Sequence, residues 1–375
     1  MKILFISRAY PPITGGIENQ NYALSVWLGK HATVRTLANV SGKAGLVFFL
    51  PKVFLQSLFL LRNYDAVLLG DGVLAPLGFV LKLFYQKKIV ASVLHGLDIT
   101  FASKEGFLPQ MYALINIPCL RKLDLLITVS HETALVAHQA GIPQGKCVVI
   151  PNGIDPATLS GSGTFNRKDL EIFLGRDLSD TLVILRSGRY VKHKGVEWFI
   201  RNVVPHLPKN TLFVAAGPVV KKNTPGDSDI YPECQEAVRE LGLESQVILL
   251  THIPWDKVVL LYHTADIVVA PNILVPGTME GFGITVIEAA LCGRVVVASS
   301  LEGIKDAITH GENGLLVTPG NAQEFVYVIT RLLADPEERE RLGKKASLYT
   351  LSHYHWDAIA KEYVKALTKK MPHSI

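Results

Sequence analysis

Short runs of apolar residues alternate along the whole chain with stretches whose apolar residues recur every three or four positions. The runs are rich in Val, Ile and Leu, which is typical of strands buried in a parallel sheet. Their alternation with helical stretches predicts βαβ units. The predicted strands cover residues 3–7, 33–37, 66–69, 89–94, 125–129, 148–150, 182–185, 212–215, 247–250, 267–270, 295–298 and 315–317.

This rhythm is interrupted once. Residues 156–180 contain Gly161, Ser162 and Gly163 together with mixed charges, which predicts a linker and a short helix. A chain of 375 residues is also longer than one ordinary domain. We therefore expect an α/β protein with two doubly wound halves, in which ligands bind beyond the carboxyl ends of the strands. A single barrel would need no such linker.

The segment 44–61 is apolar over 18 residues but contains Pro51, Lys52 and Gln56. A membrane-spanning helix needs about 20 predominantly apolar residues, and a proline beside a lysine at mid-span argues against one. A helix buried in the core and a helix that contacts a membrane surface remain open as alternatives. Residues 1–160 carry 14 Lys and Arg against 8 Asp and Glu, so the basic excess belongs to this half.

Cysteine usage and the first residues bear on the compartment. The four cysteines are far apart and lack the C-x-x-C spacing of a zinc site or redox pair. Arg8 and two prolines follow the first apolar run after one strand's length, so we expect a buried strand there and no signal peptide. A cytoplasmic protein fits these features.

Glu280 and Glu288 flank a glycine-containing run that follows the predicted strand 267–270. Residues 284–292 have helical spacing, so both carboxylates lie at a loop-to-helix junction beyond the end of a strand. Gly281 and Gly283 let backbone N–H groups approach a phosphate at the helix start. A solvated helix cap with surface carboxylates is the alternative interpretation.

Cations follow the predicted strand 182–185. Arg186, Arg189, Lys192 and Lys194 fall within nine residues, ahead of a predicted helix. Such a set can neutralise a diphosphate, with Arg binding in a bidentate manner. Nucleic acid is the rival partner, but the second half of the chain is slightly acidic and no groove-reading or stacking motif accompanies the cluster, so we expect none.

Two further motifs follow strands of the first half. Gly15 and Gly16 occupy a strand-to-helix turn that can expose N–H groups to a phosphate or sugar. The spacing is not that of a dinucleotide fingerprint. His95 follows the strand 89–94, where side chains line the ligand edge of such a sheet. Asp98 serves that edge or caps the next segment.

These motifs together with the run 149–155 resemble those of glycosyltransferase family 4. The resemblance extends from residue 1 to about residue 370, and the two-glutamate motif is its most specific element. It implies the GT-B fold, in which two Rossmann-like domains face a central cleft and a C-terminal helix crosses back to the N-terminal domain. The expected acceptor-binding domain then comprises residues 1–160 with a helix near 355–370, and the donor-binding domain comprises residues 161–354.

The resemblance also implies roles for the residues. Arg189 and Lys194, beside Gly188, hold the nucleotide diphosphate, while Glu288 binds the ribose and Glu280 contacts the donor sugar. The other implied donor-binding residues are Gly15, Gly16, Gly281, Phe282, Gly283, Ile284 and Thr285.

His95 is implied to approach the sugar from the other domain, and with Arg189, Lys194 and Glu280 it completes the expected catalytic set. No metal-ligand cluster is evident, so no metal or other cofactor is expected.

The expected activity is retaining transfer of a hexosyl group from a UDP- or GDP-sugar to a hydroxyl acceptor, in cell-surface polysaccharide or glycolipid synthesis. The basic, apolar first half favours a lipid-linked acceptor and peripheral attachment to the inner, anionic face of the membrane. A nucleotide-sugar epimerase of the same fold and a non-catalytic nucleotide-sugar-binding scaffold are the alternatives. Product analysis without acceptor distinguishes the epimerase, and absence of turnover distinguishes the scaffold.

Overall fold

The chain folds into two compact units. The computed structural model describes residues 1–13, 15–161, 165–220 and 229–371. One unit comprises Met1–Gly153 with Tyr354–Ile375, and the other comprises Ile154–His353. These bounds lie close to the boundaries expected from the sequence, whereas Ser162 and Gly163 of the expected linker lie outside the described residues.

The first unit is built on a parallel sheet of six strands in the order β2-β1-β3-β4-β5-β6. The chain moves one way from β1 to β2 and the other way from β3 onward, so the order reverses between β1 and β3. The strands are β1 Lys2–Ser7, β2 Thr33–Ala38, β3 Ala66–Leu69, β4 Ile89–Leu94, β5 Leu125–Thr128 and β6 Cys147–Val149.

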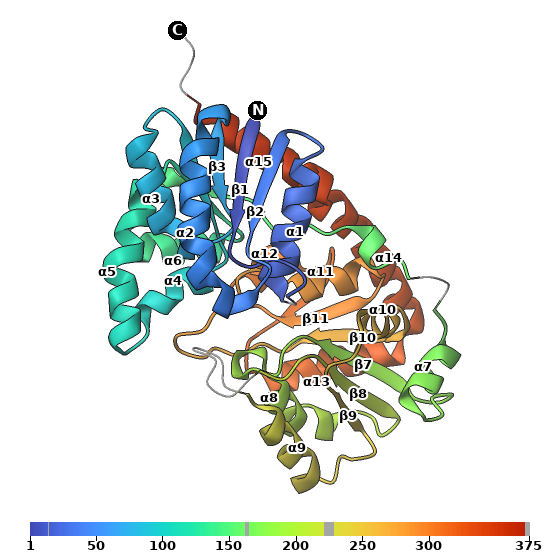
Figure 1. The fold of residues 1–375 in the computed structure, drawn as a ribbon. Helices are drawn as coiled ribbons and strands as arrows, with labels where there is room; N and C mark the ends of the chain where they lie inside the picture. Colours follow the sequence, from blue (N-terminus) through green and yellow to red (C-terminus); the bar gives the residue numbers. More distant parts are fainter. Residues whose placement is uncertain (14, 162–164, 221–228, 372–375) are drawn as a thin grey trace. The chain divides into compact units, whose positions relative to one another are not determined.

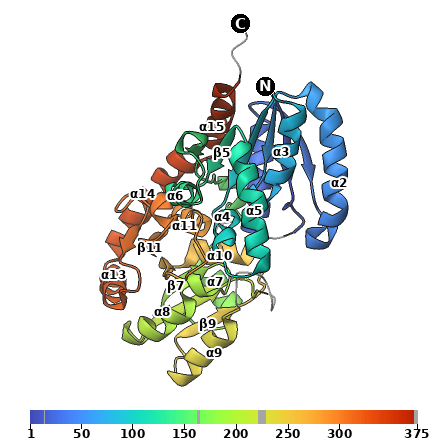
Figure 2. The same cartoon turned by 90° about the vertical axis from the view of Figure 1, so that its left-hand side faces the viewer.

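Helices cover both faces of this sheet. Right-handed crossovers place α1 on one face, and α2, α3 and α5 on the other, because the chain moves in opposite directions across the sheet. Figures 1 and 2 show α2, α3 and α5 side by side. The helices of this unit are α1 Gly16–Leu28, α2 Gly42–Leu60, α3 Ala75–Phe84, α4 Leu97–Thr100, α5 Phe107–Lys122, α6 His131–Gln139 and α15 Trp356–Lys369.

The last helix, α15, returns to the first unit, as the family resemblance implies. It packs along α1 (Figure 1). Asp357 Oδ1 lies 2.8 Å from His31 Nε2, and the buried Trp356 ring lies so close to Gly153 that a β-carbon there would meet it at 2.3 Å. The expected C-terminal crossing helix is therefore confirmed.

The second unit repeats the doubly wound plan. Its six parallel strands lie in the order β12-β11-β10-β7-β8-β9, so the order reverses between β7 and β10. The strands are β7 Leu182–Ser187, β8 Thr211–Ala216, β9 Val247–Leu250, β10 Ile267–Ala270, β11 Val295–Ser299 and β12 Leu315–Val317. The helices are α7 Arg167–Leu174, α8 Val196–Asn202, α9 Tyr231–Glu240, α10 Trp255–Thr264, α11 Ile284–Leu291, α12 Ile304–Ala307, α13 Ala322–Ala334 and α14 Pro336–Tyr354.

Each strand predicted from an apolar run is present, with ends that differ by at most two residues. The agreement has a physical cause, because strands covered on both faces must be apolar at consecutive positions. The central strands β3, β4, β5 and β10 are buried at every position.

The helix α2 corrects one alternative. The segment Ala44–Asn63 is long and apolar enough to cross a membrane by length and composition, yet only 17% of its most apolar window is buried. Val53, Ser57 and Leu61 face the core at four-residue spacing, while Phe48 is 81% exposed. The interpretation of this segment as a helix buried in the core is therefore wrong, since only one stripe of it packs inward.

Candidate functional site

The order reversal in the second unit places two loops beside one another. In open α/β sheets, ligands bind beyond the carboxyl ends of the strands at such a point. The loop after β7 carries Gly188, Arg189 and Lys194, and the loop after β10 carries Asn272 and Glu280. The structure thus brings together two motifs that lie about ninety positions apart in the sequence.

Lys194 and Glu280 form an ion pair between the two loops. Lys194 Nζ donates to Glu280 Oε2, and Asn272 Nδ2 donates to the same oxygen at 3.0 Å. Each side chain of the ion pair is 13% exposed. Burial opposes ionisation of Glu280, but the charges of Lys194 and His193 outweigh it and lower the pKa of Glu280 to about 2. Glu280 is therefore ionised at neutral pH.

The backbone around Glu280 is also held in place. Its N–H donates to Glu302 Oε2 at 2.6 Å, and its carbonyl oxygen accepts from the Gly303 N–H at 3.0 Å. A β-carbon on Gly303 would meet the carbonyl oxygen of Gly281 at 2.2 Å. The loop before α11 is thus packed directly against the start of α12.

The helix α11 begins in the way the sequence predicts. Gly283 is its N-cap with φ of 96°, a conformation that favours glycine, and no side chain caps the helix start. Phe282 is buried, while Gly281, Ile284 and Thr285 are partly exposed. The N–H groups at the start of a helix bind anions because of their direction and the helix dipole.

Glu288 lies one turn into α11 and contacts α10. The Tyr262 hydroxyl donates to Glu288 Oε2 at 2.9 Å. Burial raises the pKa of Glu288 to about 7, although the bond from Tyr262 opposes that rise. The carboxyl group therefore changes its charge near neutral pH, unlike Glu280.

Arg186 supports the loop after β7 from below. It is 2% exposed, and its Nη1 donates to the carbonyl oxygens of Gly188 and Arg189. Burial lowers its pKa to about 10. Gly188 has φ of 124°. A β-carbon on Gly217 would meet the carbonyl oxygen of Gly188 at 2.0 Å, so the two backbones are in close contact.

A small pocket lies where these groups meet. Its volume is about 10 Å³, enough for about one water molecule. Arg186 Nη2 is buried without a hydrogen-bond partner among the described residues. The residues that line the pocket include Arg186, Ser187, Lys194, Asn272, Glu280, Gly283 and Thr285.

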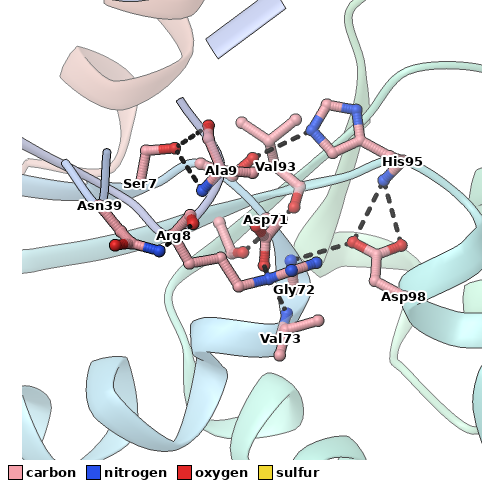
Figure 3. Close-up of polar contacts among 12 residues, drawn as sticks. Ser7, Arg8, Ala9, Asn39, Asp71, Gly72, Val73, Val93, His95 and Asp98 are labelled. Atoms are coloured by element: carbon pink, nitrogen blue, oxygen red, sulfur yellow. Dashed lines mark hydrogen bonds and ion pairs between the residues drawn. The ribbon is translucent and has the colours of Figure 1, made fainter. Parts of the chain in front are cut away.

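In the first unit, a second polar cluster lies at the reversal between β1 and β3 (Figure 3). Arg8 Nε donates to Asp71 Oδ1 at 2.9 Å, and the Asp71 side chain is 1% exposed. Asp71 Oδ1 also accepts from the Val73 N–H at 3.0 Å. Burial opposes the charge on Arg8, but Asp71 outweighs it and raises the pKa of the guanidinium.

His95 follows β4 in this cluster. Its Nε2 lies 3.0 Å from the carbonyl oxygen of Gly70. Asp98 accepts from the N–H groups of Gly72, His95 and Gly96 (Figure 3). The Asp98 carboxylate thus joins the loop after β3 to the loop after β4, whereas the N-cap of α4 is Gly96. The roles of His95, Arg189, Lys194, Glu280 and Glu288 towards a ligand stay predictions.

Gly15 and Gly16 lie at the start of α1. Gly15 is the N-cap, and no side chain caps this helix start either. A β-carbon on Gly15 would meet the carboxyl group of Glu18 at 2.1 Å. The Gly15 and Gly16 backbone is thus positioned as the expected strand-to-helix turn requires.

Within the described ranges, no three side chains among His, Cys, Asp and Glu gather closely enough to hold a metal ion. The expectation that the protein needs no metal stays a prediction.

Several polar residues of these clusters were not expected from the sequence. Tyr262 lies within the apolar helix α10, and Asn272 follows the apolar strand β10. Arg8 and Asp71 belong to no motif that was recognised. Arg186 was noted only as one of four cations. Arg8, Asp71 and Asn272 lie within two residues of the carboxyl ends of β1, β3 and β10, and this position is the signal that could have identified them.

Two protein-family models match consecutive parts of the chain. Residues 15–158 match the model described as Glycosyltransferase Family 4, and residues 173–348 match the model described as Glycosyl transferases group 1. The boundary between the matches falls in the segment that joins the two sheets.

Curated relatives agree with these matches. An uncharacterised glycosyltransferase of Methanocaldococcus jannaschii is 32% identical over 59% of this chain and 54% of its own length. A D-inositol 3-phosphate glycosyltransferase of Corynebacterium aurimucosum is 28% identical over 66% of this chain and 58% of its own length. The lipopolysaccharide 1,2-N-acetylglucosaminetransferase of Salmonella typhimurium is 25% identical over 66% and 62%, respectively. The chain thus spans less than two thirds of these relatives.

Solved structures match over almost the whole chain. Anabaena HepE in complex with UDP has a TM-score of 0.77 at 22% identity, covering 98% of this chain and 100% of HepE. A Thermosynechococcus elongatus sucrose-phosphate synthase has a TM-score of 0.76 at 20% identity, covering 98% of each chain. Likeness at this identity shows the shared fold.

Proposed function

The chain belongs to the glycosyltransferases that join a family 4 domain to a group 1 domain, and from that premise we propose that it transfers a sugar from a nucleotide-diphosphate donor to a hydroxyl acceptor. Its fold is the GT-B fold. The observation that carries the proposal is the Lys194–Glu280 pair, which joins the cationic loop after β7 to the loop before the uncapped start of α11.

The donor we propose is a UDP- or GDP-sugar. The Arg189 and Lys194 side chains supply positive charge for a diphosphate, and the start of α11 supplies N–H groups. Glu288 supplies a carboxylate for the two ribose hydroxyls. HepE, which shares the fold, was solved with UDP and with UDP-glucose, and this supports the choice of a nucleotide sugar.

We further propose that the anomeric configuration is retained. The bond between the anomeric carbon and the diphosphate oxygen breaks, and the acceptor oxygen bonds to the carbon on the same face. The acceptor proton passes to the departing phosphate oxygen. Arg189, Lys194 and the α11 dipole stabilise the charge that grows on the diphosphate, with no metal required. Glu280 is already engaged by Lys194 and Asn272, which favours a positioning role for it over a nucleophilic one.

The acceptor we propose belongs to cell-surface polysaccharide or glycolipid synthesis on the cytoplasmic side of the membrane. The Salmonella relative is named for lipopolysaccharide, which supports this class of acceptor.

A donor panel followed by product analysis tests the proposal. Thermal shift with UDP-, GDP- and ADP-sugars identifies the donor, and mass spectrometry with that donor and a hydroxyl acceptor detects transfer. We expect a glycosylated acceptor and released nucleoside diphosphate. An epimerised sugar formed without acceptor, or donor binding without turnover on any acceptor, would contradict the proposal.

A further inference from the structure

One face of the first unit is apolar over three neighbouring helices. The helices α2, α3 and α5 lie side by side on the same side of the sheet (Figures 1 and 2). We call the outward surface of these three helices the three-helix face. Of the exposed large apolar side chains among the described residues, half belong to it. They are Val47, Phe48, Leu50, Leu55 and Phe59 of α2, Leu83 and Phe84 of α3, and Phe107, Leu108, Met111, Leu114 and Ile115 of α5.

These residues form stripes rather than scattered positions. On α2, Phe48, Leu55 and Phe59 recur at helical spacing on the side opposite the buried Val53 and Ser57. On α5, Phe107, Met111, Leu114 and Pro118 do the same, opposite the buried Ile117 and Leu120. The inward stripes complete the core of the unit. The outward stripes are therefore surplus to the packing of the fold, and apolar surface of this extent marks an interaction site.

The charged residues of the three helices are all basic. The three helices contain no Asp or Glu and five Lys and Arg. Lys52, Arg121 and Lys122 are exposed, as are Arg62 and Lys87 just beyond the ends of α2 and α3. Lys82 pairs with Asp124 at 2.7 Å, Lys88 donates to the carbonyl oxygen of Arg62, and Arg121 Nη2 donates to the carbonyl oxygen of Ala140 at 2.7 Å. These three cations are therefore engaged within the chain. The side chain of Lys43 is outside the described part.

We propose that the three-helix face docks on the surface of an anionic lipid bilayer. Aromatic and aliphatic side chains enter the boundary between headgroups and acyl chains, and the exposed cations contact anionic headgroups. The three helices combine apolar stripes with cations and contain no acidic residue, and Glu105 is exposed just before α5. This excess of cations suits an anionic bilayer better than a second copy of the same face, because two copies would bring like charges together. The helix α2 lies on the bilayer and does not cross it, since Val53, Ser57 and Leu61 remain in the core.

The docking proposal does not rest on the glycosyl transfer, because it concerns binding and not turnover. It adds a surface made by α3 and α5 to the segment 44–61, which the sequence alone singled out. If both proposals hold, docking keeps the enzyme at the surface that displays a lipid-linked acceptor.

Flotation with vesicles tests the proposal. The full chain is mixed at low salt with vesicles of phosphatidylglycerol and phosphatidylcholine, or of phosphatidylcholine alone, and centrifuged through a gradient. We expect the protein to float with the anionic vesicles and to bind neutral ones at least about tenfold more weakly. Binding should also weaken as salt is raised.

Matched variants distinguish vesicle binding by the three-helix face from non-specific binding by exposed apolar residues elsewhere. Phe48→Asp and Leu114→Asp, 81% and 72% exposed in the wild type, should each reduce vesicle binding about tenfold or more. Leu348→Asp on α14 and Tyr327→Asp on α13, 71% and 69% exposed, should leave it unchanged. Melting temperatures confirm that all four fold. Equal loss in both pairs would overturn the proposal. So would failure of the wild type to float, or a dimer in sedimentation that Phe48→Asp dissociates.

Discussion

The Tyr262 hydroxyl lies 2.9 Å from Oε2 of Glu288 and donates a hydrogen bond to it. Tyr262 is buried and Glu288 is partly buried, and burial raises the pKa of each, that of Glu288 to about 7. Glu288 is the residue to which the family resemblance assigns the ribose. An ionised carboxylate accepts hydrogen bonds from two hydroxyls, whereas a protonated one keeps an O–H of its own. The charge state of Glu288 should therefore govern nucleotide affinity near neutral pH.

We expect nucleotide affinity to increase as pH rises from about 6 to about 8, because Glu288 must lose its proton before both ribose hydroxyls can donate to it. Isothermal titration calorimetry with the preferred nucleoside diphosphate across this range measures the effect. Glu288→Ala should weaken binding by at least about tenfold at pH 8, since each bond to a charged group is worth roughly 1.5 to 3 kcal/mol. Glu288→Gln should lose most of the pH dependence. The same pH dependence in Glu288→Gln would assign it to another group.

The same shift makes a prediction for the ligand-free protein. The pKa of Glu288 is raised on folding from the ordinary 4.5 to about 7. The folded chain therefore keeps a proton that the unfolded chain releases. Its contribution to the free energy of unfolding is fully present below about pH 4.5 and is lost as pH rises through about 7. Urea unfolding of the wild type and Glu288→Gln should show a smaller decrease with pH in the variant. Parallel curves would contradict the assignment.

The Lys194–Glu280 pair makes a prediction about stability. Lys194→Met leaves the carboxylate of Glu280 buried and without its cation, which costs about 3 to 5 kcal/mol when a buried pair is broken. Lys194→Met combined with Glu280→Gln removes both charges, keeps the Asn272 contact, and should recover part of this loss. Urea unfolding of the two single variants and the double variant forms the cycle. Strictly additive losses would show that the two side chains do not interact.

The loop after β7 makes a kinetic prediction. Arg189→Ala should lower kcat by a larger factor than it raises the KM for the donor, because negative charge on the departing diphosphate is greatest in the transition state. Lys194→Ala should do the same in whatever fraction folds.

Chelation with EDTA should leave the wild-type rate unchanged. Activity that disappears in EDTA and returns with magnesium or manganese would show that protein cations do not replace a metal.

The sequence predicted the fold well because strands buried on both faces have a composition that few other elements share. It predicted the positions of Glu280 and Glu288 because glycines interrupt a strand-to-helix transition there. It did not predict Tyr262 as the partner of Glu288, since Tyr262 follows Val258 to Leu261 within an apolar helix and its hydroxyl leaves no trace in the periodicity. Contacts between residues far apart in the chain depend on the order of the strands in the sheet. The residue pattern of a single segment does not predict that order.

The segment 44–61 illustrates a different reason. Its residues are apolar on all sides, so helical periodicity cannot distinguish the stripe that packs inward from the one that faces outward. The strand order determines which stripe of α2 packs inward, because it places α2 beside α3 on one face of the first sheet. The burial of Arg186 and of Asp71 was not predicted either, because a charge beside an apolar run is seen to be buried only once its partners are known.

Gly195 fixes the distance between the two loops of the second unit. Its φ is 68°, and a β-carbon there would meet the carbonyl oxygen of Pro271 at 1.9 Å. Gly175 has a similar φ of 67° with nothing within 4 Å, so it serves as a matched control. We expect Gly175→Ala to cost about 1 to 2 kcal/mol from the backbone alone. Gly195→Ala should cost clearly more in urea unfolding and should lower activity in the folded fraction. Equal losses would show that the contact with Pro271 is not restrictive.

The stereochemistry of transfer tests the reaction most directly. If the diphosphate leaves and the acceptor enters on the same face, an α-linked donor must give an α-linked product. Inversion would need a base in line with the leaving group. The Nε2 atom of His95 lies 3.0 Å from the Gly70 carbonyl oxygen, an arrangement suited to holding a ring in place. His95→Ala should therefore slow transfer without changing the anomer. The proton coupling at the anomeric centre decides for a gluco-configured donor, and a β-linked first product would refute retention together with the roles proposed for Glu280 and Arg189.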